Sequence, residues 1–438
     1  MNSKLILWSL TIALGGFLFG LDTAVISGAE QTIQKLWHLD NVTHGLAISI
    51  ALYGTVIGAM FGGYCADIFG RRKSLFWVGL LFFVSAVGTA LSQDVYTFMV
   101  LRFLGGLCIG ASSVVSPLYI AEIAPPRQRG LLVALFQFNI VFGILIAYVS
   151  NYFFQGTSEN DWRWMLGVVG FPSLAFMFLT LLISESPRWL ALRKGDVEGA
   201  RKTLNEIDPS AAGETLAAIL KSDKETTTAS RTFFSKQYRW PILLAFLFAF
   251  FNQVSGINAI IYFAPRIFEM SGLGRSSALL STAGVGVVNL LFTMLGLSLI
   301  DRYGRKMLMY IGSLGYIISL GLIASAFYRD SFEGMTFFVF MFIASHAIGQ
   351  GAVIWVFIGE IFPNQVRASG QALGGFTHWI FAAIIANIFP VAAGAFGGAP
   401  IFLFFMVMMV GQLLFVAFMM PETKGVALED MAMRIGHG

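Results

Sequence analysis

The chain has 438 residues, of which 57% are hydrophobic and only 12% are charged. An ordinary soluble protein has roughly a quarter of its residues charged, so this composition excludes a soluble enzyme. The two cysteines, Cys65 and Cys108, are too few for a disulfide scaffold, and both are expected to be buried free thiols because they lie in apolar segments. The apolar stretches recur along the whole chain and predict a protein that crosses a membrane many times.

A helix that crosses a hydrocarbon core of ~30 Å needs about 20 residues. Twelve windows of that length lack unpaired charge. The predicted spans are 5–28, 44–65, 74–93, 97–120, 131–153 and 162–183, and then 240–263, 277–299, 307–328, 335–359, 368–390 and 399–420. The polar segment between the two sets is predicted to form short amphipathic helices at Val197–Ile207 and Ala212–Ser222. The predicted fold class is therefore all-α with twelve transmembrane helices.

The positions of Lys and Arg predict the orientation in the membrane, because both residues favour cytoplasmic loops. If the amino terminus is inside, most of the 28 Lys and Arg residues lie on the inner side. The outer loops then hold Lys35, Arg163, Arg266, Arg275 and Arg329. We therefore expect both termini in the cytosol, with the chain in a plasma membrane or a bacterial inner membrane. The net charge of +4 reflects this bias and does not indicate nucleic acid as a partner. The first apolar stretch is expected to be retained as a helix.

The sequence contains an internal repeat. Asp67 and Asp301 lie 234 residues apart in similar loops, GGYCADIFGRRK and LIDRYGRKM, and Glu122 and Glu360 lie 238 residues apart in a second pair. The repeat predicts a six-helix bundle at 1–184, a cytosolic linker at 185–238 and a second six-helix bundle with a short tail at 239–438. Two parallel repeats around a central cavity are the architecture of an alternating-access transporter.

Several further motifs accompany the repeated loops: GFLFGLDTAVISG (Gly16–Gly28), RFLGGLCIG (Arg102–Gly110), SESPRWL (Ser184–Leu190), NQVSGINAIIYFAP (Asn252–Pro265) and PETKG (Pro421–Gly425). With these motifs the chain resembles the sugar porter family of the major facilitator superfamily over nearly its whole length, and particularly its bacterial proton-coupled members. The resemblance implies the major facilitator fold, a monosaccharide substrate such as a hexose or pentose, a proton as partner, surrounding membrane lipid, a functional monomer, and no cofactor or metal.

Asp22 and Arg102 are charges inside predicted spans, where a charge at the helix centre costs about 2.5 to 3.5 kcal/mol on insertion scales, so each needs a partner. Both lie at a similar distance from the predicted outer helix ends and are expected to pair. Desolvation favours the neutral acid and the guanidinium favours the anion, so small movements would load or release a proton. The resemblance implies the same coupling role. The alternative is a permanently ionised pair that only ties two helices together.

A neutral sugar requires uncharged amides and aromatic faces. Asn252, Gln253 and Asn258 lie in the seventh span, where Gly256 permits a broken helix. The resemblance implies that sugar is bound by Gln137, Gln253, Asn258, Asn289 and Trp355, with Asn252 and His378 as further candidates. Phe19 lies three residues before Asp22, so a sugar at its ring would sense the state of the acid, and Trp379 is a candidate to close the outer side of the site. For a single amide the alternative is a hydrogen bond between helices, and for a single aromatic residue it is packing.

The sequence departs from the family pattern at three of these positions. Asn252 stands where many relatives have Gln, His378 where they usually have an amide, and Ala352 where a proline is common. A neutral, hydrogen-bonding histidine is favoured at 378 over a pH-sensitive one. These changes leave the class of substrate intact but leave the particular sugar open.

A set of charged residues lies where the inner ends of the predicted helices meet the cytosol. We call them the inner-gate residues: Asp67, Arg71, Arg72, Glu122, Arg129, Glu185, Arg188, Asp301, Arg302, Arg305, Glu360 and Arg367. The resemblance implies that their salt bridges hold the two halves together in one state and separate in the other. The alternative is a solvated rim, where an exposed pair contributes only ~0 to 1 kcal/mol.

The leading prediction is therefore a secondary transporter that moves a monosaccharide inward with a proton. The first alternative is a facilitator without coupling. The second is a sugar sensor that does not transport, although such a protein would be expected to have a longer cytosolic extension than the segment after Met420. The sequence contains no Walker motif, so neither nucleotide hydrolysis nor another enzyme activity is expected.

Overall fold

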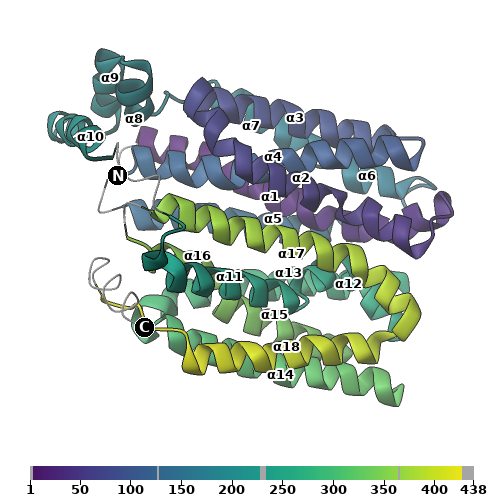
Figure 1. Cartoon of the computed structure of the whole chain (residues 1–438). Coiled ribbons are helices and arrows are strands. Elements are labelled where there is room, and N and C mark those ends of the chain that lie inside the picture. Colours follow the sequence, from purple (N-terminus) through teal and green to yellow (C-terminus); the bar gives the residue numbers. More distant parts are fainter. Residues whose placement is uncertain (1–2, 126–127, 227–232, 364–365, 427–438) are drawn as a thin grey trace. The chain divides into compact units, whose positions relative to one another are not determined.

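The computed structural model describes residues 3–125, 128–226, 233–363 and 366–426. Within these ranges the chain forms helices and no strand, and twelve helical segments are long and apolar enough to cross a membrane. Figure 1 shows the helices coloured along the sequence. The predicted all-α class and number of spans are confirmed.

The first six spans are built from seven α-helices. Five spans are single helices: α1 (Ser3–Leu36), α2 (Asn41–Phe69), α3 (Arg71–Leu91), α4 (Val95–Ile123) and α5 (Arg129–Phe154). The sixth span consists of α6 (Asp161–Gly167) and α7 (Gly170–Thr180). The polar segment that follows contains α8 (Pro187–Trp189), a π-helical turn (Leu190–Lys194), α9 (Val197–Ile207) and α10 (Ala212–Thr226). Both predicted linker helices are present, and the second is longer than expected.

Two of the last six spans are interrupted. The seventh contains a 3-10 turn (Lys236–Tyr238), α11 (Arg239–Val254) and α12 (Ile257–Met270), and the tenth contains α15 (Met335–His346), a π-helical turn (Ala347–Gly351) and α16 (Ala352–Glu360). The others are α13 (Arg275–Tyr303), α14 (Arg305–Arg329), α17 (Arg367–Phe396) and α18 (Gly398–Phe418). The break between α11 and α12 lies at Gly256, whose φ of 85° is left-handed, and a Cβ there would lie 2.5 Å from the ring of Phe405. The predicted break at this glycine is confirmed.

Some predicted span ends are wrong. The first helix extends to Leu36 rather than 28, and the seventh span extends to Met270 rather than 263. The prediction ended each span before a charged residue, Glu30 or Arg266. These two residues form a salt bridge with each other, so both charges are accommodated within the helices and the helices extend past them. Arg266, which was expected in an outer loop, lies inside α12.

The chain divides into two compact units. Unit 1 comprises Met1–Thr23, Tyr53–Ile144 and Leu166–Arg231, and unit 2 comprises Ala24–Leu52, Leu145–Met165 and Thr232–Gly438. The repeat predicted a different division, with one bundle ending at 184 and the other beginning after 238. That division follows the order of the spans in the sequence, and it stays a prediction.

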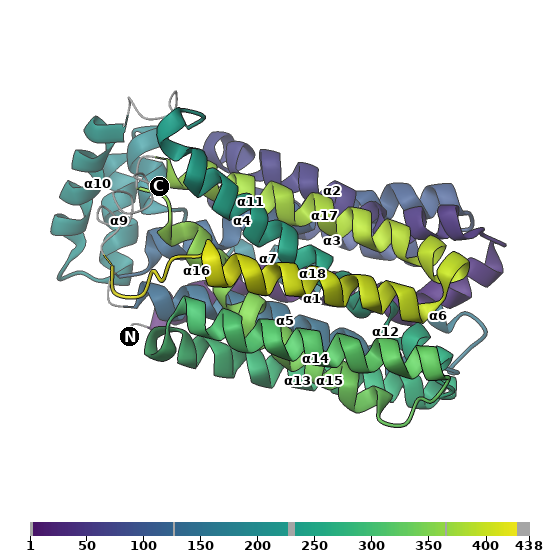
Figure 2. The ribbon, with the colours of Figure 1, turned by 60° about the horizontal axis from the view of Figure 1, so that its bottom comes forward.

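In unit 1, α3 packs along α4 and α7. The linker helices α9 and α10 lie beside each other at one end of the unit, as both ribbon views show (Figures 1 and 2). A small apolar cluster joins them to the π-helical turn through Leu190, Ala200, Leu204 and Leu216. The linker is therefore a packed helical element.

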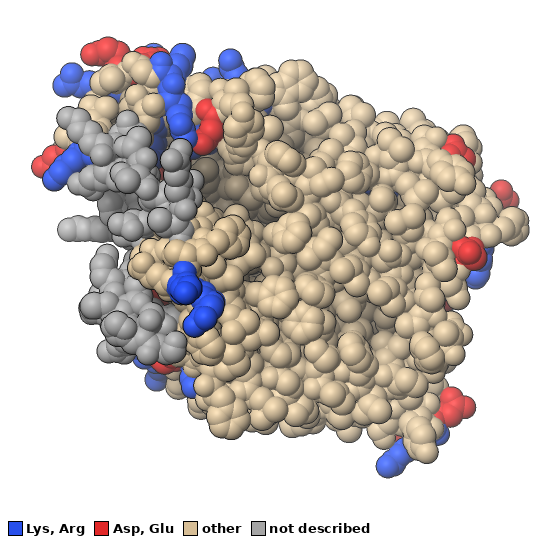
Figure 3. All heavy atoms as spheres, in the orientation of Figure 1, with Lys and Arg blue, Asp and Glu red and all other residues tan. Residues whose placement is uncertain are grey.

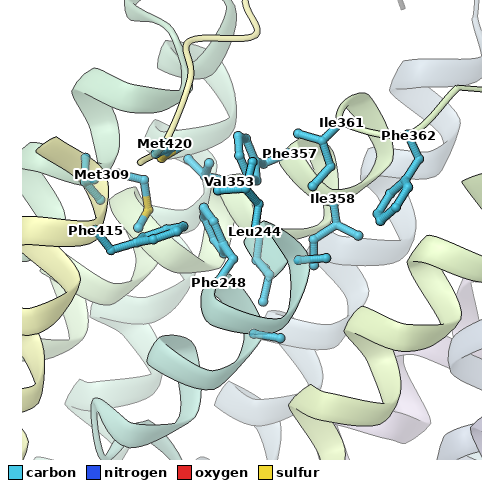
Figure 4. Packing of buried hydrophobic residues seen from close by; sticks show 14 of the residues in the cluster. Leu244, Phe248, Met309, Val353, Phe357, Ile358, Ile361, Phe362, Phe415 and Met420 are labelled. Carbon is cyan, nitrogen blue, oxygen red and sulfur yellow. The ribbon is translucent and has the colours of Figure 1, made fainter. Parts of the chain in front are cut away.

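In unit 2, α14 packs along α18 and α11 packs along α17. A buried cluster fills the space between α11, α16 and α18, where Phe248 stacks on Phe357 and meets Phe415 edge-on (Figure 4). These are helices of the seventh, tenth and twelfth spans. Their apolar side chains fix the ends of α11 and α16 that lead to the candidate site.

The surface agrees with a membrane location. In the face shown in Figure 3, charged side chains gather at the ends of the helices, and the surface between those ends is formed by uncharged residues. Cys108 is buried as expected, but Cys65 is exposed, which corrects the expectation for that thiol. The reason is that membrane helices are apolar on the lipid-facing side as well, so an apolar environment in the sequence does not predict burial inside the protein.

Candidate functional site

The two charges inside spans form a buried pair in unit 1. Arg102 Nη1 on α4 donates to Asp22 Oδ1 on α1 at 2.8 Å, and Nη2 donates to the Asp22 carbonyl at 3.3 Å. The side chains are only 2% and 3% exposed. Within the described residues, neither Asp22 Oδ2 nor Arg102 Nε has a hydrogen-bond partner. The predicted pairing is thus confirmed, and one carboxylate oxygen is left with an open hydrogen-bonding position.

A glycine on α4 lies beside this open oxygen. A Cβ at Gly105 would lie 3.6 Å from Asp22 Oδ2 and 2.6 Å from Ser85 Oγ on α3. The Ser85 hydroxyl donates to the Leu101 carbonyl of α4 at 2.7 Å. Helices α3 and α4 therefore approach closely at the acid, and a larger residue at 105 would fill the space next to Oδ2.

In unit 2, three predicted amides meet at the break of the seventh span. Asn258 Nδ2 on α12 donates to Gln253 Oε1 on α11 at 2.5 Å. Gln253 Nε2 donates to Asn252 Oδ1 at 2.9 Å and lies 3.1 Å from both ring nitrogens of His378 on α17. All three amides are buried. The break brings residues from both sides of Gly256 to one place.

Aromatic rings adjoin these amides. The ring centroids of His378 and Trp355 are 5.1 Å apart, and those of His378 and Trp379 are 4.7 Å apart. The Trp355 side chain on α16 is 38% exposed, whereas Trp379 is buried. Unit 2 therefore combines buried carboxamides with an accessible indole, which is the chemistry that binds a polyhydroxylated, uncharged ring.

Three predicted sugar-binding residues are not joined to this cluster by any described hydrogen bond. Asn289 on α13 is buried and accepts from Thr293 Oγ1 of its own helix at 3.4 Å. Gln137 on α5 and Phe19 on α1 are half-buried and belong to unit 1. Their part in sugar binding stays a prediction.

Three inner-gate residues of unit 1, Asp67, Arg71 and Glu122, form a network around the Arg71 guanidinium. Its Nε and Nη2 each donate to one oxygen of Glu122 at 3.0 Å, and its Nη1 donates to Asp67 Oδ1 at 2.9 Å. The Ser186 hydroxyl donates to Glu122 Oε2 at 2.6 Å. The bidentate pair between a guanidinium and a carboxylate is a strong and geometrically specific contact.

Unit 2 repeats this network around Arg305. Its Nε and Nη2 donate to the two oxygens of Glu360 at 3.0 and 2.7 Å, and its Nη1 donates to Asp301 Oδ1 at 3.0 Å. The Thr423 hydroxyl donates to Glu360 Oε2 at 2.6 Å, as Ser186 does to Glu122 in unit 1. The repeat seen in the sequence thus extends to individual hydrogen bonds.

A second pair of carboxylates completes the two networks. Glu185 accepts from the backbone N–H groups of Arg71 and Arg72, at the start of α3. Burial raises the pKa of Glu185 above its ordinary value, and the N–H donors of Ser186, Arg72 and Arg71 only partly offset this.

Glu422 occupies the same position in unit 2 and accepts from the backbone N–H groups of Arg305 and Lys306, at the start of α14. Burial acts to raise the pKa of Glu422, but backbone N–H donors from four residues outweigh it, so the pKa is below its ordinary value. Ser186, Glu422 and Thr423 were not among the predicted residues. Two family motifs, SESPRWL and PETKG, contain all three and carry the signal that could have identified them.

Several predicted inner-gate residues make other contacts. Arg72 donates to the carbonyls of Thr180 and Leu181 at the end of α7, and Arg302 lies over the ring of Tyr303. Within the described residues, Arg367 Nε and Nη2 have no hydrogen-bond partner, and Arg188 has no ion pair. These four arginines thus form no ion pair within the described residues, and their part in an inner gate stays a prediction. The Arg129 side chain lies outside the described residues.

Sequence reasoning also missed a buried cluster in unit 2. Arg266 on α12 donates from Nε and Nη2 to the two oxygens of Glu30 on α1, at 2.9 and 2.6 Å. His44 Nε2 on α2 lies 2.8 Å from Glu30 Oε2, and Gln34 Oε1 accepts from Arg266 Nη2 at 2.6 Å. Glu30 and His44 are fully buried. The cluster joins α1 and α2 to α12, and the only signal in the sequence was a pair of charges at the ends of predicted spans.

Comparisons with known proteins agree with this structure. The model of the family described as "Sugar (and other) transporter" matches residues 8–434. The arabinose-proton symporter of Bacillus subtilis is 40% identical over 97% of this chain and 94% of its own length. The D-xylose-proton symporter of Escherichia coli is 34% identical over 97% of this chain and 94% of its own length.

Solved structures give the same result. The xylose transporter XylE of Escherichia coli, in a partially occluded inward open conformation, matches with a TM-score of 0.87 and 33% identity, and covers 97% of this chain and 100% of that chain. Its complex with 6-bromo-6-deoxy-D-glucose matches with a TM-score of 0.83 and 33% identity over 99% of both chains. The protein is thus a multi-pass membrane protein, and its relatives are transporters and not enzymes. The chain belongs to the sugar transporter family and is a sugar porter of the major facilitator superfamily.

Proposed function

We propose that this chain is a secondary transporter that moves a monosaccharide, a hexose or a pentose, together with a proton by alternating access. The observation that carries the proposal is the buried pair of Asp22 and Arg102, in which one carboxylate oxygen has no described hydrogen-bond partner. The relatives named as arabinose-proton and D-xylose-proton symporters support the same coupling.

The proton is carried by Asp22. In the observed geometry Arg102 contacts only Oδ1 of the side chain, so the carboxylate receives one strong bond where a bidentate pair would give two. Burial penalises the charged form, and a displacement of the guanidinium leaves the carboxylate without its counter-ion. Protonation then becomes favourable, and the return of Arg102 expels the proton. A pair that alternates between these arrangements couples proton binding to helix movement.

The sugar is held by the amide cluster of unit 2 and by the indole of Trp355. Hydroxyl groups donate to and accept from the amides of Gln253, Asn258 and Asn252, while the apolar face of the ring lies on the indole. Gln137, Phe19, Asn289, His378 and Trp379 are further sugar-binding residues in this proposal. Because every one of these side chains is uncharged when His378 is neutral, the site suits a neutral sugar and discriminates against sugar phosphates and sugar acids.

The inner-gate networks around Arg71 and Arg305 lie at the cytosolic ends of the spans, and both termini are cytosolic. The distribution of Lys and Arg supports this orientation. The protein works as a monomer surrounded by lipid, and the alternation of state is carried within one chain by its two repeats.

The proposal is tested with purified protein in liposomes of weak buffering capacity. Addition of the transported sugar, chosen by competition among arabinose, xylose and glucose, is expected to make the external medium alkaline, and a protonophore is expected to abolish the signal. Uptake of the sugar without any proton movement would identify an uncoupled facilitator instead. Sugar binding without any uptake would identify a sensor.

A further inference from the structure

The amides of the candidate sugar site continue into the interior of unit 2 as a single line of hydrogen bonds. Asn252 Nδ2 donates to Gln350 Oε1 at 3.2 Å, Gln350 Nε2 donates to Gln412 Oε1 at 2.7 Å, and Gln412 Nε2 donates to Ser313 Oγ at 2.8 Å. Together with the bonds from Asn258 to Gln253 and from Gln253 to Asn252, they form what we call the amide relay: Asn258, Gln253, Asn252, Gln350, Gln412 and Ser313.

The relay crosses unit 2 through elements far apart in the sequence. Gln350 comes from the π-helical turn of the tenth span, Gln412 from α18 and Ser313 from α14. All three are completely buried. The turn lies tightly against α14, because a Cβ at Gly349 would be 2.9 Å from the Cα of Gly312. Wide turns of this kind often occur at functional sites.

All five carboxamides of the relay point the same way: the first four each donate an N–H to the carbonyl oxygen of the next, and Gln412 donates to the Ser313 hydroxyl. A carboxamide that turned over alone would place oxygen against oxygen on one side and N–H against N–H on the other. In a buried environment such a mismatch leaves polar groups unpaired, so the five amides keep one direction together. Bonds aligned in one direction also polarise one another and become stronger.

The direction of the relay decides what Asn258 offers at its end. In the observed direction Asn258 donates one N–H to Gln253, so its Oδ1 and its second N–H remain for a ligand. In the reverse direction its Oδ1 would already accept from Gln253, so both N–H groups and only one lone pair of Oδ1 would remain. The observed direction therefore leaves Oδ1 wholly free to accept from a sugar hydroxyl.

We propose that Gln350, Gln412 and Ser313 are positioning residues, which fix the direction of the relay and so select a sugar with a hydroxyl that donates to Asn258. The proposal rests on the proposed function, because it assumes that the amide cluster binds the sugar. At the far end, Ser313 accepts the last N–H. Without that acceptor, the observed direction would leave the Gln412 N–H buried without a partner, whereas the reverse direction would leave the Gln412 carbonyl without a donor, which is better tolerated in protein interiors. Loss of the Ser313 hydroxyl therefore favours the reverse direction.

The test uses monofluorinated sugars, because fluorine replaces a hydroxyl without being able to donate a hydrogen bond. With the protein in liposomes, we expect fluorination at one position of the transported sugar to weaken competition about tenfold, as expected for a buried acceptor left unpaired. Ser313→Ala is expected to reduce this penalty at the same position to about threefold or less, and Gln412→Met is expected to do the same. The other positions of fluorination should change little.

A matched control lies on the same helix. Ser319 of α14 is also completely buried, but its hydroxyl donates to the Gly315 carbonyl of its own helix and lies outside the relay. Ser319→Ala should keep the full penalty. A uniform loss of affinity for all sugars in the Ser313 and Gln412 variants, with an unchanged fluorination profile, would show a structural role only and overturn the inference. A wild-type protein with no sensitivity to fluorination at any position would also overturn it.

Failure of the proposed function gives a different result. If the wild-type protein neither takes up nor binds any sugar of the panel, the sugar site itself is wrong. If the variants take up sugar normally and show the same fluorination profile as the wild type, the sugar site is retained and the role given to the relay is wrong. Gln350→Met removes the acceptor of Asn252 and so interrupts the relay. It serves as a further variant if Ser313→Ala or Gln412→Met folds poorly. The same reduction of the fluorination penalty is expected for it.

Discussion

Glu185 and Glu422 hold equivalent positions in the two repeats, each accepting the first backbone N–H groups of a helix that starts after a glycine of positive φ. The same helices then supply Arg71 and Arg305, each bound in a bidentate manner by a glutamate, Glu122 or Glu360. A carboxylate at a helix N-terminus satisfies N–H groups that have no partner in the helix and interacts favourably with the helix dipole.

Glu185→Gln and Glu422→Gln are expected to differ in their pH dependence. The pKa of Glu422 is below its ordinary value of 4.5 in the folded protein, so its stabilisation is complete above that value and is lost as the pH falls through the folded pKa. The pKa of Glu185 is raised, so its contribution is complete below the ordinary value and is lost as the pH rises through the folded pKa.

At neutral pH, Glu422→Gln should therefore lower Tm more than Glu185→Gln, with a loss of about 1 kcal/mol expected for a helix cap. Thermal unfolding in detergent between acidic and neutral pH measures the difference. The difference between wild type and Glu422→Gln should shrink on acidification. A larger loss for Glu185→Gln at neutral pH would contradict the assignment.

Gly70→Ala and Gly304→Ala are expected to be strongly destabilising. The φ angles are 94° and 90°, and an added Cβ would lie 2.3 Å from Glu185 Oε2 or 2.5 Å from Glu422 Oε2. The strain costs on the order of 1 to 3 kcal/mol at each position, and the displaced carboxylate loses its N–H donors as well. Gly213→Ala on exposed α10 is the control, because a Cβ there meets nothing within 4 Å, and it should leave Tm unchanged or slightly higher. Equal effects at all three positions would refute the role given to the two turns.

Arg266→Gln should cost much more stability than an exposed charge change. It leaves the fully buried Glu30 without its guanidinium, and removal of one partner of a buried pair costs about 3 to 5 kcal/mol. Lys4→Gln is the comparison, because Lys4 pairs with Glu206 at an exposed site where a pair contributes about 0 to 1 kcal/mol. The double variant Glu30→Gln, Arg266→Gln should recover part of the loss. Thermal unfolding that shows additive losses in the double variant would exclude coupling between the two residues.

Double neutralisation of Glu122 and Glu360 is expected to shift the resting population of the transporter toward the inward-facing state. Each substitution leaves a largely buried arginine without its bidentate carboxylate, in a network that the proposal assigns to the cytosolic closure. Accessibility of an introduced cysteine at Gln137 to a membrane-impermeant reagent from either side measures the shift. The background needs Cys65→Ser because that thiol is exposed. Unchanged accessibility from both sides would reject this role.

Several features of the fold could be predicted because their cause is local or repeated. The lengths of the apolar windows predicted all twelve spans, Gly256 predicted the break of the seventh, and the repeated loops contain Arg71 and Arg305 at matching positions, where the structure shows matching hydrogen bonds. The first two depend on the spacing of residues within one short segment, and the third depends on the similarity of two segments, which a comparison of the sequence with itself detects.

The contacts that sequence reasoning missed depend on three-dimensional proximity between distant segments. The first and seventh spans were predicted too short, because each prediction stopped before a charged residue. Neither segment alone shows that Glu30 and Arg266 pair with each other. Gln350 and Gln412 lie in apolar segments far apart in the sequence, and only the fold aligns them with Asn252. The contact between Asp22 and Arg102, in contrast, was predicted, because both residues lie at a similar distance from the predicted outer ends of their helices. The predicted end of the first helix was nevertheless wrong.

The central claim is tested most directly by the transport behaviour of Asp22→Asn in liposomes. Asp94→Asn is the matched control, because Asp94 caps the start of α4, the helix of Arg102, and asparagine caps a helix about as well. If Asp22 carries the proton, Asp22→Asn loses uphill accumulation of sugar driven by a pH gradient and keeps exchange of labelled for unlabelled sugar, while Asp94→Asn keeps both. Uphill accumulation that survives in Asp22→Asn would contradict the account.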